Sequence, residues 1–65
     1  MIDLIIASSA IELRKRICDS ISRHLLDLSI SRAIAQERKD VCEADVELSV
    51  QPAFEAMKKE IFPNE

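Results

Sequence analysis

The fold is decided by residues 8–45, SSAIELRKRICDSISRHLLDLSISRAIAQERKDVCEAD. Neither Gly nor Pro occurs in this stretch, so neither of the usual helix-ending residues interrupts it. Ser9 and Glu12 have the S-x-x-E spacing of a capping box, which predicts a helix start at Ser9. The charged run that begins at Glu37 predicts the helix end. We therefore expect one long amphipathic helix over residues 9–37.

A helix of this length predicts a dimer. At 1.5 Å per residue it would be about 43 Å long, whereas a compact chain of this size has a diameter of roughly 28 Å. Its apolar residues also cover more of the circumference than the single stripe of a surface helix. The expected partner is a second copy, with a different chain as the alternative. The predicted dimer core comprises Ile17, Ile21, Leu25, Leu28 and Val41.

The segments on either side complete one all-α domain over residues 1–65. Residues 1–7 are expected to form an extended arm, or one helical turn capped by Asp3, that packs on a partner or on the long helix. A shorter helix is predicted over residues 43–61, because acidic residues begin it and apolar residues recur at helical spacing. Pro52 within it predicts a kink, or a break into two helical pieces.

The composition agrees with helices and excludes several functions. The chain has no Gly, 3% aromatic residues and 48% hydrophobic residues, a balance that favours helices over a turn-rich β fold. The apolar run near the N-terminus is too short for a signal peptide or a membrane span, which predicts a cytoplasmic protein without membrane contact. Cys18 and Cys42 fit no metal or redox spacing, and His24 is expected to pair with Asp27. We expect no metal, no cofactor, no small-molecule substrate and no enzymatic activity.

Charge is segregated along the chain. The net charge is −3, yet residues 14–39 carry seven basic and three acidic side chains. Such segregation indicates either an anionic partner or docking between copies. The basic side chains that precede the turn are Arg14, Lys15, Arg16, Arg23 and Arg32.

The turn between the two helices carries a family resemblance. The pattern Arg38-Lys39-x-Val41-x-x-x-Asp45-Val46 resembles the histone fold, especially the minimal histones of archaea and bacteria. In that family a long central helix leads through a loop of type R-K-T-[VI]-x-x-x-D-[VI] into a shorter last helix. The family's short first helix has no counterpart here, and Asp40 replaces the loop threonine. The helical lid of AAA+ ATPases shares the local pattern and is a second, less complete resemblance.

The histone resemblance implies a function and roles for residues. It implies that Arg38 and Asp45 form a structural clamp and that Lys39 contacts DNA phosphate. The basic residues at 14–16, 23 and 32 would extend this contact, which gives a nucleoid-associated protein, or a nuclear one in a eukaryote, that binds double-stranded DNA without sequence specificity. The alternative is a histone-fold dimerisation module within a larger complex that does not bind DNA.

Overall fold

The computed structural model describes residues 4–64, which contain two helices and no strand. Helix α1 spans Ser8–Ala35 and helix α2 spans Glu43–Ile61. The all-α, two-helix prediction is therefore confirmed. Residues 4–7 precede α1 without helical structure, while the rest of the predicted arm, including Asp3, lies outside the described residues. No helix in residues 4–64 is both long and apolar enough to cross a membrane.

The start of α1 differs from the predicted capping box. The N-cap is Ala7, no side chain caps the helix, and the helix begins at Ser8. The amides of Ala10 and Ile11 both donate to the Ala7 carbonyl, at 3.0 and 3.2 Å. Glu12 instead lies one turn from Lys15, with its carboxylate 3.8 Å from the Lys15 ammonium. The predicted Ser9–Glu12 box is therefore wrong, because that spacing requires Ser9 as the N-cap and the observed N-cap, Ala7, lies two residues earlier.

Helix α1 ends at Ala35 in a Schellman motif, two residues before the predicted end. The Glu37 amide donates to the Ile34 carbonyl at 2.9 Å, and the Arg38 amide donates to the Ala33 carbonyl at 2.9 Å. Glu37 has φ 56°, the left-handed conformation that this motif requires and that glycine usually supplies. The reversal at Glu37 directs the chain back toward α2 and sets the position of Arg38.

Helix α2 continues across Pro52 without interruption. Because Pro52 has no N–H group, the Leu48 carbonyl has no donor within the helix. Leu48 is 59% exposed, so water has access to this carbonyl. The predicted alternative of two separate helical pieces is therefore not observed. Glu43 and Asp45 lie in the first turn of α2 and Lys58 and Lys59 in its last turn, as the helix dipole favours.

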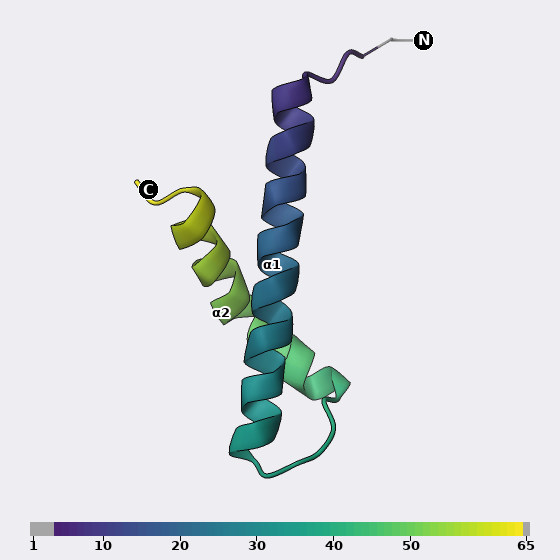
Figure 1. Ribbon diagram of the computed structural model, residues 1–65, viewed down its shortest axis with the longest axis vertical. Coiled ribbons are helices and arrows are strands. Elements are labelled where there is room, and N and C mark those ends of the chain that lie inside the picture. Colours follow the sequence, from purple (N-terminus) through teal and green to yellow (C-terminus); the bar gives the residue numbers. More distant parts are fainter. Residues whose placement is uncertain (1–3, 65) are drawn as a thin grey trace.

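The two helices cross one another (Figure 1), and most of the side chains buried between them are small. On the α1 side the buried residues are Ser20, Ser29 and Ala33, and on the α2 side they are Asp45, Ser49, Ala53 and Met57. Small residues allow two helices to approach closely because no long side chain separates their backbones. The Ser49 hydroxyl donates to the Asp45 carbonyl at 2.7 Å, which pairs this buried polar group.

The molecule is an open hairpin with far more surface than a compact monomer. Its dimensions are 52 × 32 × 14 Å and its radius of gyration is 15.6 Å, compared with about 11 Å for a compact chain of this length. Its accessible surface is 5485 Å², roughly 1300 Å² above the value of about 4200 Å² expected for a folded monomer of this mass. Figure 1 shows the cause: the first turns of α1 extend beyond the end of α2.

Candidate nucleic-acid interface

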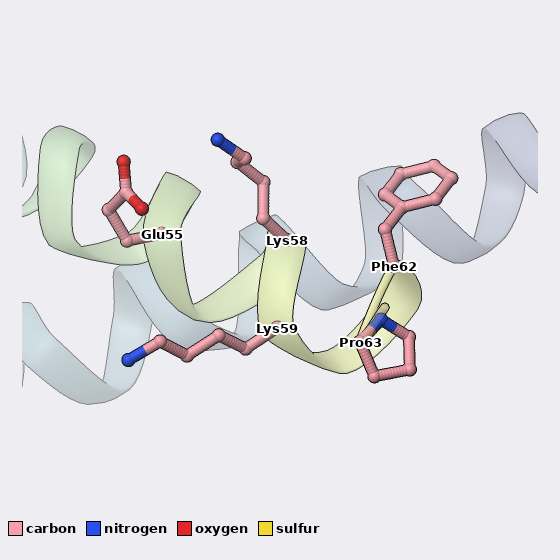
Figure 2. A pocket seen from close by; sticks show the side chains of 5 residues that line it. All are labelled: Glu55, Lys58, Lys59, Phe62 and Pro63. Atoms are coloured by element: carbon pink, nitrogen blue, oxygen red, sulfur yellow. The ribbon is translucent and has the colours of Figure 1, made fainter. Parts of the chain in front are cut away.

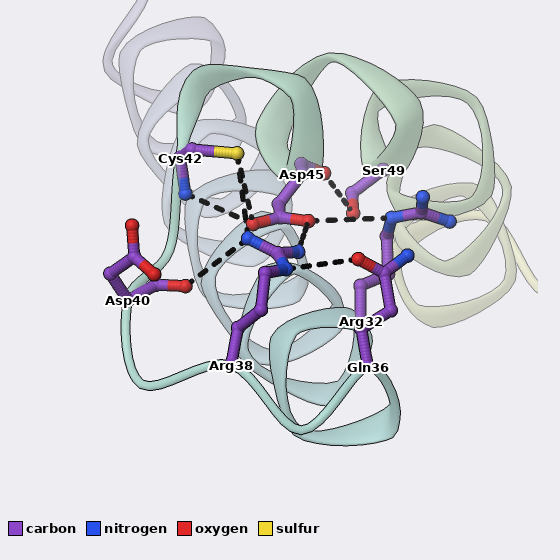
Figure 3. A network of polar contacts seen from close by, with 7 residues as sticks. All are labelled: Arg32, Gln36, Arg38, Asp40, Cys42, Asp45 and Ser49. Carbon is purple, nitrogen blue, oxygen red and sulfur yellow. Dashed lines mark hydrogen bonds and ion pairs between the residues drawn. The ribbon is translucent and has the colours of Figure 1, made fainter.

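The loop that carries Lys39 is held by Arg38 (Figure 3). Its guanidinium donates from Nη2 to Asp45 Oδ1 at 2.5 Å and from Nε to Gln36 Oε1 at 2.9 Å. The same group reaches the Asp40 carbonyl oxygen at 3.4 Å. The predicted Arg38–Asp45 pair is therefore present, with one hydrogen bond from the guanidinium to the carboxylate.

The buried carboxylate of Asp45 contacts Arg32 of α1, Arg38 of the loop and the backbone amide of Cys42 at the start of α2. The Asp45 side chain is 2% exposed. Oδ2 accepts the backbone amide of Cys42 at 2.9 Å, so Asp45 also closes the N-terminus of α2. The Arg38 hydrogen bond, followed by that of the Cys42 amide, lowers the pKa of Asp45 from 3.8 to about 2. Asp45 is therefore ionised across the neutral range.

A second carboxylate joins the helices at the other end of α2. Glu60 accepts hydrogen bonds from Arg23 Nη2 at 2.5 Å and from Ser20 Oγ at 3.0 Å, and its Oε2 lies 2.8 Å from His24 Nε2. Hydrogen bonds from Arg23, His24 and Ser20, in that order, lower the pKa of Glu60 from 4.5 to about 2. The predicted His24–Asp27 pair is wrong, because the ring nitrogen of His24 turns toward α2 and contacts Glu60.

Only a weak signal in the sequence points to this second site. Ser20, Arg23 and His24 follow at helical spacing and share a face of α1. Their partner lies 36 to 40 residues away, however, and only the crossing of the helices brings it near. Ser20 and His24 bond the same carboxylate oxygen and not each other, which is not the serine–histidine–carboxylate order of a nucleophilic triad.

The predicted DNA-contacting residues fall into two groups. Arg23 is paired with Glu60, and Arg32 Nε lies 3.8 Å from Asp45 Oδ1, so both are engaged within the chain. The remaining basic residues are exposed. Within residues 4–64, Lys15 is paired only with Glu12, and no ion pair involves Arg14, Arg16 or Lys39.

The predicted contact residues that are not paired with α2 lie at opposite ends of α1. Arg14 and Arg16 are in its first third, whereas Lys39 follows its C-terminus beside the exposed Asp40. From Arg14 to Ala35 the helix rises about 32 Å. One chain therefore presents two separate basic positions instead of one continuous patch.

The predicted dimer-core residues are incompletely covered in the single chain. Ile17, Ile21, Leu25 and Leu28 are half-buried, and Val41 is exposed. Among the described residues, the buried apolar side chains are Ala33, Ala53 and Met57. The larger apolar side chains remain exposed in two stripes at spacings of four residues, which we call the outer stripes: Leu26, Ile30 and Ile34 on α1, and Val46, Val50 and Phe54 on α2.

A small hollow lies near the C-terminus of α2 (Figure 2). Its volume of about 190 Å³ is lined by Glu55, Lys58, Lys59, Phe62 and Pro63. The hollow is smaller than the usual ligand pocket, which encloses at least about 300 Å³. One of its lining residues, Lys58, has its ammonium 5.6 Å from the centre of the Phe54 ring. Among the described residues, no cluster of three or more His, Cys, Asp or Glu side chains is placed to hold a metal ion.

Comparison with known proteins identified no relative: the chain matches no protein-family model, no curated protein and no solved structure.

Proposed function

We propose that the protein is a small histone-fold-like dimer that binds double-stranded DNA through its phosphate backbone, without sequence specificity, in the nucleoid. The observation that carries the proposal is the pair of outer stripes on a hairpin whose loop is clamped by Arg38 and Asp45. These stripes give each chain an apolar surface that its own fold leaves uncovered. The loop clamp fixes Lys39 on the exposed side of the turn.

The surface area supports a second copy as the partner. The excess of roughly 1300 Å² per chain over a compact monomer is within the range that each subunit buries in a permanent dimer, about 1000 to 2500 Å². In a symmetric dimer the same surface of each copy forms the interface. A two-fold axis that passes between the two α1 helices near their middle, perpendicular to them, makes these helices antiparallel. Ile17 and Ile21 lie close to this midpoint.

Antiparallel pairing also supports the DNA contact. When the pair is centred between Ile21 and Ser22, Arg14 of one copy faces Ser29 of the other. Lys39 of that second copy then lies within about 10–15 Å along the helix axis, compared with about 32 Å within one chain. Two equivalent basic surfaces result, each able to follow several phosphates.

A DNA titration tests this function. Fluorescence anisotropy with a labelled 30-base-pair duplex at 20 mM salt should give binding at micromolar dimer, with equal affinity for unrelated sequences. Lys39→Glu should weaken binding to every sequence and reduce the slope of log affinity against log salt by about two, since two contacts per dimer are lost. Lys59→Glu is the matched control, because it makes the same charge change on α2. No binding to wild-type dimer, or equal effects of both variants, would contradict the proposal.

The alternative function is a dimerisation module that does not bind DNA. The engagement of Arg23 and Arg32 with Glu60 and Asp45 favours it, as does the net charge of −3. In this alternative the acidic C-terminal half contacts another protein. Dimerisation without any DNA affinity at 20 mM salt would select it.

A further inference from the structure

The residues that precede α1 expose apolar side chains to an unusual degree. Leu4, Ile5 and Ile6 are 83%, 96% and 67% exposed. They are not packed on α1, which was one of the two expected positions of the arm, and they lead away from α2 (Figure 1). Three adjacent large apolar residues form the kind of exposed patch that marks an interaction site.

An apolar groove lies at the opposite end of the molecule. The residues that line it are Leu28, Ser31, Arg32 and Ala35 of α1 and Leu48, Ser49 and Pro52 of α2. Its volume is about 330 Å³, and most of its surface is apolar. This volume is near the lower size limit of a site that encloses apolar groups. Leu48, at its edge, is 59% exposed, so the groove is open to an incoming side chain.

The arm cannot occupy the groove of its own chain. From Ser8 to Leu28 the helix rises about 30 Å. Four residues from Leu4 to Ser8 reach about 14 Å when fully extended. The arm therefore ends at least about 15 Å short of the nearest groove residue, even when folded back along α1.

We propose that Leu4–Ile6 of one copy inserts into the apolar groove of a second copy, so that each groove is completed by the other chain's arm. The inference rests on the antiparallel dimer proposed above. When α1 helices pair about the point between Ile21 and Ser22, Ser8 of one copy faces Ala35 of the other, at the edge of the groove. The arm's reach of about 14 Å then takes it from this edge into the groove as long as the helix ends lie closer together than that. Apolar side chains and an apolar groove are thereby placed together at both ends of the dimer.

Site-specific disulfide formation tests the insertion. Two differently tagged proteins are prepared with Cys18→Ser and Cys42→Ser, one also carrying Ile5→Cys and the other Leu48→Cys. A disulfide requires Cα atoms about 4.4–6.8 Å apart, so mild oxidation should give a covalent heterodimer as the main product. The matched control replaces Leu48→Cys by Glu55→Cys, an exposed position on α2 outside the groove, and should give less than about a tenth of that yield.

A dissociation measurement separates this proposal from dimerisation itself. Ile5→Ser with Ile6→Ser should raise the dimer Kd at least about tenfold, because two apolar side chains lose their burial. Glu55→Ser, at the exposed position on α2 outside the groove, should leave it within twofold. A disulfide yield no higher than that of the control, together with an unchanged Kd, would overturn the proposed insertion but not the proposed dimer. A folded wild-type monomer at 50 µM in sedimentation would overturn both, and the groove would then be left for a different protein.

Discussion

Two carboxylates join α1 to α2, and they differ in almost everything except their charge. Asp45 is 2% exposed, its hydrogen-bond partners are three and seven positions away, and Arg32 of α1 lies 3.8 Å from it. Glu60 is 41% exposed, and its partners on α1 are 36 to 40 positions away. The pKa of each is lowered to about 2. A similar pKa therefore does not imply a similar structural role, because solvent screens the attraction within an exposed ion pair much more than within a buried one.

Removal of each carboxylate gives the largest expected effect. Asp45→Ala should lower the melting temperature by roughly 10 °C or more, because it removes the α2 cap and leaves the Arg38 guanidinium without its acceptor. Glu60→Ala should lower it by only a few degrees, since its ion pairs are partly exposed. Circular dichroism at 222 nm, at one chain concentration for all variants, measures both. Equal decreases would show that burial does not distinguish the two sites.

Acid should weaken both sites at once. Each carboxylate has a folded-state pKa below its usual value of 3.8 or 4.5, so its stabilisation is complete above about pH 5 and is lost as pH falls toward 2. The free energy of unfolding in urea should therefore decrease steadily from pH 5 to pH 2.5. Asp45→Asn should flatten this decrease, whereas Asp40→Asn, at an exposed loop position, should leave it unchanged.

The two arginines beside Asp45 give a smaller and sharper test. Arg38 donates a hydrogen bond to the carboxylate, while Arg32 Nε lies at 3.8 Å from the same oxygen. Arg38→Ala should therefore lower the melting temperature more than Arg32→Ala. Equal melting temperatures would contradict the clamp.

The smallest expected effect has the opposite sign. Glu37→Gly should raise the free energy of unfolding by about 0.5–1 kcal/mol, because glycine adopts the left-handed conformation of the Schellman motif without steric cost. Gln36→Gly, at a position with φ −97°, is the control and should not stabilise. A decrease for Glu37→Gly would mean that its side chain contributes more than the backbone conformation costs.

The sequence was a good guide wherever the deciding residues are close together along the chain. The uninterrupted helical pattern between Ser9 and Glu37 predicted α1, and the histone-like pattern of the turn predicted the clamp between Arg38 and Asp45. The end of α1 was placed two residues late because Glu37 takes a conformation that glycine normally marks.

Prediction failed where the crossing of the two helices decides the contact. Glu60 looked like an ordinary acidic residue near a helix end, and nothing local links it to Ser20, Arg23 and His24. The same crossing pairs Arg23 with Glu60 and brings Arg32 Nε to 3.8 Å from Asp45 Oδ1. Pro52 is tolerated because it and Leu48, whose carbonyl it leaves without a helix hydrogen bond, lie on the exposed face of α2. Which face is exposed depends on the orientation of α2.

The small buried core has a consequence for how the protein matures. Among the described residues the buried apolar side chains are Ala33, Ala53 and Met57, so under the proposed pairing a newly made chain gains little stability until it binds a second copy. Under the proposed pairing, folding is second order in chain concentration, so that its half-time shortens as synthesis proceeds. Chains that remain single would be unfolded much of the time and open to proteolysis. The amount of the protein in the cell would then depend on how fast two chains meet and form a dimer.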